Sequence, residues 1–177
     1  SDYPVFPSEV EVSRPGADGY FSDWPHPVLT LVIESQGVCA WGVALDGPEA
    51  GQVVVGWAED PEVAPTVVYC PDVQSFIGIR AWDRGERDEI HLSAQAKELD
   101  SLALTFLRAQ LSQGPTTYGW PCRENYRFEG DGLRILLWSC PGQCDWFVSG
   151  TEVTMRRWTP RLLALSDLAS ALYATDD

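Results

Sequence analysis

The most obvious metal-ligand candidates in the sequence are two cysteines around a tight turn. Cys140 and Cys144 flank Pro-Gly-Gln, and two thiolates on either side of such a turn can chelate zinc. A zinc knuckle normally has Cys-x2-Cys spacing and needs a second close pair of ligands. The other candidates are too scattered to form one: Cys39, Cys70, Cys122, His26 and His91. We therefore expect Cys140 and Cys144 to face each other across a hairpin as packing residues, with no metal or cofactor.

Carboxylates gather in a second segment, Asp83 to His91. It contains Asp83, Glu86, Asp88 and Glu89, interspersed with Arg84 and Arg87. A pair of catalytic carboxylates must be held at a fixed separation in a cleft, whereas neighbouring charges of both signs are typical of a solvated loop. We predict a charged surface loop whose four acidic residues contact a protein partner.

Nucleophilic catalysis by Ser-His or Cys-His pairs has few possible bases here. The sequence has only two histidines, and His26 stands between two prolines. No glycine-rich phosphate loop or dinucleotide fingerprint is present. We expect the protein not to be an enzyme.

The composition limits the class of protein and its partners. The chain has 177 residues, 45% of them hydrophobic, and a formal net charge of −14. This charge argues against nucleic acid as a ligand and favours a basic partner, although it could equally serve solubility alone. No apolar run is long enough to span a membrane. The odd cysteine number and the lack of a secretory signal predict a cytoplasmic protein; oligomeric state stays open.

Two β-hairpins are the clearest predicted elements. Val28 to Ile33 and Val38 to Leu45 are apolar runs joined by residues 34–37, in which Gly37 can take a positive φ. A second hairpin is predicted over 126–138 and continues into Asp145 to Ser149 as a meander. Further strands are expected at 52–57 and 66–69. Residues 1–27 are rich in proline and are predicted to be irregular.

Three segments have helical patterns. Residues 72–82 favour a helix capped by Asp72, though an extended segment also fits. Leucines at helical spacing predict a helix from Ser93 to Leu111, capped by Ser93, and another from Thr159 to Tyr173. Meanders with segregated helices indicate an α+β fold. We predict one mostly antiparallel sheet of about six or seven strands, with helices on one face, forming a single domain over 28–177.

The first hairpin resembles a known family. Its Glu-x-Gln-Gly-Val-Cys-x-Trp-Gly string is similar to the Glu-Asn-Gln-Gly-Val-x-x-Trp-Gly hairpin of the SUKH superfamily, with Asp60-Pro61-Glu62-Val63 resembling a second family element. The fold-defining residues under this resemblance are Glu34, Gln36, Gly37, Trp41 and Gly42. The superfamily consists mostly of bacterial immunity proteins of toxin systems, with some eukaryotic regulators. It implies an α+β fold and no catalytic role for these residues.

The resemblance and the charge together suggest an immunity protein that neutralises a cognate, basic toxin through an acidic surface. Trp24 and Trp120 lie in irregular segments where an aromatic side chain can anchor a partner or, equally well, its own loop. A regulatory or scaffold module of the same fold is an alternative. A small hydrolase or a carbohydrate-binding domain is another.

Overall fold

The computed structural model describes the whole chain except residues 1–2, 5–10, 59–63, 86–89, 166–172 and 175–177. The chain forms two compact units. Unit 1 comprises Ser1–Ala81 and Tyr118–Trp120, and unit 2 comprises Trp82–Thr117 and Pro121–Asp177. A single domain over 28–177, preceded by an irregular segment, stays a prediction. The boundary between the two units lies between Ala81 and Trp82, within the first helix.

Unit 1 is built on the predicted first hairpin. Strands β3 (Val28–Ile33) and β4 (Cys39–Ala44) pair antiparallel, and β5 (Val53–Trp57) and β6 (Val67–Cys70) extend the sheet. Gly37 has a φ of 74° in the turn, as predicted. The two-residue strands β1 (Tyr3–Pro4) and β2 (Val12–Ser13) both pair with β3, so the sheet has six strands.

Both faces of this sheet are covered. On one face, Trp41, Val53 and Val55 form a core with Phe76 and Ile79 of helix α1 (Val73–Arg84). Asp72 caps this helix by accepting a hydrogen bond from the backbone N–H of Ser75, 2.6 Å away, which confirms the helical alternative.

The N-terminal segment covers the opposite face of the sheet in unit 1. Phe21 is buried there with Val28, Ala40 and Val54, and Tyr20 and Trp24 pack around them. The approach is so close that a Cβ on Gly56 would lie 1.9 Å from the carbonyl oxygen of Tyr20. The segment that the sequence predicted to be irregular is therefore part of the core of this unit.

Unit 2 is built on the predicted meander. Strands β10 (Glu124–Gly130), β11 (Leu133–Cys140) and β12 (Gln143–Gly150) pair antiparallel, and β7 (Ile90–Ala96) pairs with β12. The first turn places Asp131 and Gly132 at positive φ, which matches the right-handed twist of a hairpin. Short strands β8 (Ser112–Gln113), β9 (Thr117–Tyr118) and β13 (Tyr173–Ala174) bring this sheet to seven strands.

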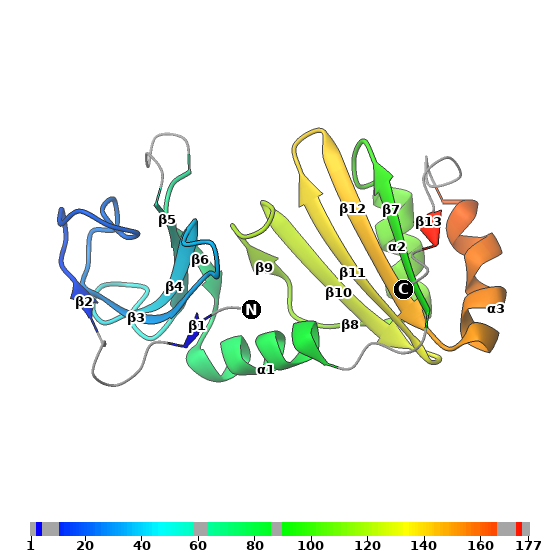
Figure 1. Ribbon diagram of the computed structural model, residues 1–177, viewed down its shortest axis with the longest axis horizontal. Helices are drawn as coiled ribbons and strands as arrows, with labels where there is room; N and C mark the ends of the chain where they lie inside the picture. The colour runs from blue at the N-terminus through cyan, green and yellow to red at the C-terminus, as the bar shows by residue number, and fades with distance from the viewer. Residues whose placement is uncertain (1–2, 5–10, 59–63, 86–89, 166–172, 175–177) are drawn as a thin grey trace. The chain divides into compact units, whose positions relative to one another are not determined.

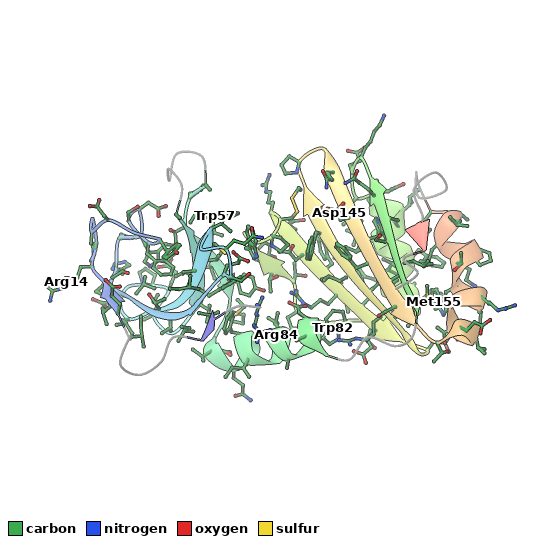
Figure 2. All side chains as sticks on the ribbon, viewed as in Figure 1. Arg14, Trp57, Trp82, Arg84, Asp145 and Met155 are labelled. Carbon is green, nitrogen blue, oxygen red and sulfur yellow. A yellow bond between two sulfur atoms is a disulfide. The ribbon has the colours of Figure 1, made fainter. Side chains whose placement is uncertain are left out.

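Helices α2 (Ser101–Gln110) and α3 (Glu152–Leu163) pack on one face of this second sheet (Figure 1). Their buried residues, including Leu107, Met155 and Trp158, join a core with Phe128 and Trp146 of the strands. Met155 is labelled in Figure 2. The α+β class is thus confirmed.

The expectation of one sheet is wrong, because the strands form two separate sheets. The helix predicted over Ser93–Leu111 is also wrong in its first half: residues 90–96 form β7, and α2 begins after its N-cap Asp100. Small residues such as Ala94 and Ala96 face the core here and gave a weak strand signal.

The predicted helix from Thr159 to Tyr173 begins earlier. Thr151 caps α3 by accepting a hydrogen bond from the N–H of Thr154, and Pro160 lies within its last part. Residues 166–172 of the predicted helix lie outside the described part of the chain, and Tyr173 belongs to β13.

Replacement of Gly56 by alanine should destabilise the protein. The new Cβ would meet the backbone of Tyr20 and the ring of Phe21, which cannot both move without opening this face of the sheet. We expect a loss of about 2 to 3 kcal/mol in the free energy of unfolding, measured by urea denaturation.

Gly78→Ala is the matched control. Gly78 lies in α1 with open space around the position of a Cβ. Alanine there should be neutral or stabilising by about 0.5 to 1 kcal/mol, because it has the higher helix propensity. Equal losses in the two variants would contradict the packing described for Gly56.

Candidate functional site

The polar groups in the turn of the first hairpin bond mainly to one another and to the backbone of the turn. One oxygen of the Glu34 carboxylate accepts a hydrogen bond from the N–H of Gln36 (2.7 Å) and the other from the hydroxyl of Ser35 (2.8 Å). Burial acts to raise the pKa of Glu34, but these hydrogen bonds outweigh it and the pKa is lowered. The Gly37 carbonyl accepts from the hydroxyl of Tyr20. These contacts agree with a structural role.

Trp41 and Gly42, which complete that motif, are both core residues. The Trp41 side chain is fully buried, with the guanidinium of Arg80 stacked 4.7 Å from its ring centroid. A Cβ on Gly42 would lie 2.4 Å from a methyl group of Val28. Both residues therefore contribute to the packing of unit 1.

The predicted charged loop differs from the structure at its two ends. Asp83 lies in the last turn of α1, and Ile90 and His91 lie in β7. Glu86, Asp88 and Glu89 lie outside the described residues, so their partner contacts stay predictions. The interpretation of Asp83 to His91 as one continuous loop is wrong.

Asp83 is paired with Arg127, a residue that the sequence analysis did not single out. Arg127 lies in β10, and its side chain is only 4% exposed. Its Nε and Nη2 donate to the two carboxylate oxygens of Asp83 at 2.7 and 2.8 Å. Its Nη1 donates to the hydroxyl of Thr117 and the carbonyl of Pro115. The signal available in the sequence was an arginine between two aromatic residues of a predicted strand.

A second arginine lies beside this pair. The guanidinium of Arg134 stacks 4.2 Å from the ring centroid of Trp82, and the indole N–H of Trp82 donates to Glu129 at 2.7 Å. Trp82 is labelled in Figure 2 at the end of α1. These contacts lie on the face of the sheet opposite to α2 and α3. The contacts of Trp82, together with the pairing of Asp83 and Arg127, hold the last turn of α1 against the sheet of unit 2. Asp83 is therefore already paired within its own unit.

The cysteines are arranged differently from the prediction. Cys122 and Cys140 form a disulfide, whereas Cys144 pairs in register with Ser139 and is buried with a free thiol. The expectation that Cys140 and Cys144 face each other across the hairpin is therefore wrong, because the two-residue turn places Cys140 opposite Gln143. In the register of β10 and β11, Glu124 pairs with Ser139, so Cys122 lies just beyond the paired end of β10, near Cys140. Extending the predicted hairpin by this register would have indicated the disulfide.

The buried thiols of Cys39 and Cys144 are poorly suited to nucleophilic chemistry. Burial, with a smaller effect of Asp145, raises the pKa of Cys144 to about 12, and burial, with a smaller effect of Glu34, also raises the pKa of Cys39. A thiol with such a pKa is almost entirely protonated at neutral pH. Among the described residues no group of three or more His, Cys, Asp or Glu is placed to hold a metal ion.

The two tryptophans predicted to bind a partner are both half-buried in unit 1. Trp24, in the N-terminal segment, packs against the core that contains Phe21 and Val54. Trp120 meets Trp57 edge to face, with ring centroids 5.2 Å apart; Trp57 is labelled in Figure 2. Both therefore anchor their own segments, and a role in binding a partner stays a prediction.

Negative charge is divided unequally between the units. Unit 1 contains 12 acidic residues and two arginines, a formal charge of −10, whereas unit 2 contains 14 acidic and 10 basic residues, a charge of −4. Of the two arginines, Arg80 stacks on buried Trp41 and Arg14 is exposed. Glu11, Asp18 and Asp46 are exposed on this unit. The excess of negative charge is thus mainly a property of unit 1.

Comparison with protein-family models found no matching family, and searches of the curated proteins and of the solved structures gave no significant match. No helix in the described part of the chain is long and apolar enough to cross a membrane.

Asp83→Ala should strongly destabilise unit 2. It leaves the guanidinium of Arg127 buried without its carboxylate, a change that ordinarily costs about 3 kcal/mol or more. Urea denaturation monitored by circular dichroism measures the loss.

The matched control is Glu152→Ala, which removes the carboxylate of an exposed pair with Arg156. Because both of its side chains are more than half exposed, we expect a loss below about 1 kcal/mol. A loss for Asp83→Ala as small as that of the control would show that the buried pair does not support the fold.

Proposed function

We propose that the chain is a non-enzymatic, immunity-type protein that binds and neutralises a cognate, basic bacterial toxin. The resemblance of the 34–42 hairpin to the SUKH superfamily suggests the biological role. The charge of −10 on unit 1 is the observation that supports the mechanism.

Electrostatic capture requires a field and does not require a catalytic cleft. Charges of one sign on a compact unit raise the local concentration of an oppositely charged protein and accelerate its association. Exposed Glu11, Asp18 and Asp46 contribute to such a field, and only two arginines oppose it in this unit. A tight complex that covers the active site of a toxin would then be sufficient to neutralise it.

A regulatory or scaffold module that binds a basic host protein draws support from the same charge. The two proposals differ only in the identity of the partner. A toxin recovered with the chain favours the first, and a host protein recovered with it favours the second.

The test begins with capture of the partner from the source cell at low salt, followed by mass spectrometry and purification of the retained protein. The association rate constant is then measured by stopped-flow fluorescence at increasing salt. We expect a decrease of about tenfold or more between about 10 and 500 mM salt, because the ions screen the attraction. An association rate that is independent of salt would contradict electrostatic capture.

Two charge-neutralised variants locate the field. Glu11→Gln with Asp18→Asn removes two exposed charges from unit 1, and Glu98→Gln with Glu152→Gln removes two from unit 2. We expect the first variant to slow association about two- to tenfold and the second to slow it less. Equal effects would contradict the assignment of the acidic surface to unit 1.

A further inference from the structure

The Cys122–Cys140 disulfide lies close in sequence to a short segment that belongs to a different unit from the residues before and after it. Tyr118–Trp120 belongs to unit 1, whereas Thr117 and Pro121, on either side of it, belong to unit 2. The disulfide follows this segment by two residues. Any restraint at Cys122 therefore limits the conformations open to the chain that carries Trp120.

The segment packs closely within unit 1. Gly119 has a φ of 92°, and a Cβ at this position would lie 2.5 Å from Val55 and 2.7 Å from Val67. Trp120 adds its edge-to-face contact with Trp57. These contacts require the backbone of 118–120 to be held in one place.

Three kinds of restraint hold the segment and its flanks. Strand β9, which includes Tyr118, pairs with β10. The buried side-chain amide of Asn125 donates to the carbonyl oxygens of Cys122 (3.1 Å) and Thr117 (3.4 Å). The disulfide joins Cys122 to the end of β11. Of these restraints, only the disulfide can be opened and closed by redox chemistry.

We propose that the Cys122–Cys140 disulfide is a redox-operated clasp that fixes the segment carrying Trp120. When it opens, the paired strands β10 and β11 remain joined by their seven register pairs. Cys122 loses its covalent restraint, the chain that precedes it becomes less restrained, and Trp120 separates more readily from Trp57.

The opening step needs a dithiol reductant. Its thiolate attacks the sulfur of Cys140, because Cys140 is a more exposed residue than Cys122, and the S–S bond breaks. Cys122 leaves as a thiolate and takes up a proton, and the second thiol of the reductant then displaces Cys140 from the mixed disulfide. The protein gains two electrons and two protons, and the reductant becomes a disulfide. Buried Cys39, Cys70 and Cys144 take no part.

The test compares the oxidised full-length chain with the chain treated with dithiothreitol under native conditions. Thiol titration after denaturation should give three thiols before treatment and five after it. Far-UV circular dichroism should be unchanged. Tryptic cleavage after exposed Arg123 should accelerate about tenfold or more, and cleavage after Arg108 within α2 should not change.

Fluorescence reports on Trp120 directly. Reduction should increase quenching by acrylamide in the wild type, and this increase should be much smaller in Trp120→Phe. The double variant Cys122→Ser with Cys140→Ser should resemble the reduced protein and should not respond to dithiothreitol, which excludes effects through the other cysteines.

Three results would overturn the proposal. The first is five thiols before reduction, because the disulfide would then not form. The second is reduction with unchanged cleavage at Arg123 and unchanged quenching, because the disulfide would then not restrain the segment. The third is loss of the circular dichroism signal on reduction, which would make the disulfide a support of the whole fold and not a local clasp.

Discussion

The burial of one guanidinium, that of Arg127, constrains much of unit 2. An ionised group with a 4% exposed side chain must have its charge and its N–H donors satisfied, because desolvation costs several kcal/mol otherwise. Asp83 supplies the charge, and Pro115 and Thr117 supply further acceptors. The end of α1 and the chain before β10 are thereby held on one face of the sheet. The same pairing satisfies a carboxylate that the sequence suggested was available to a partner.

The faces of the two sheets are covered by different elements. In unit 1 a helix covers one face and the N-terminal segment covers the other, at a distance that only glycine permits at position 56. In unit 2 both helices cover one face, while the opposite face carries the ion pair and the stacked pair of Trp82 and Arg134. Unit 1 therefore has apolar packing on both faces of its sheet, and that unit also carries most of the net charge.

Unit 1 thus combines a sheet that is covered on both faces with a large negative charge, which is the combination that the proposed binding function requires. The thiols of Cys39 and Cys144 are buried and disfavoured as thiolates, and the carboxylate of Glu34 is hydrogen-bonded within its own turn. Under the proposed function, the field of charge on unit 1 would guide a basic partner whatever the exact contact residues are, because electrostatic attraction acts over about 10 Å at moderate salt. Specificity would then depend on short-range contacts.

The sequence by itself determined the elements that depend on local interactions. Both hairpins were predicted because turn residues such as Gly37 and alternating apolar positions act within a few residues of each other, and the α+β class followed from them. Only the tertiary structure decided the separation into two sheets, the pairing of Asp83 with Arg127 across 44 residues, and the disulfide between Cys122 and Cys140. These features depend on which faces meet in space. The local pattern over Ser93–Leu111 could not distinguish a strand followed by a helix from one long helix, because the core-facing residues of the strand, Ala94 and Ala96, are small.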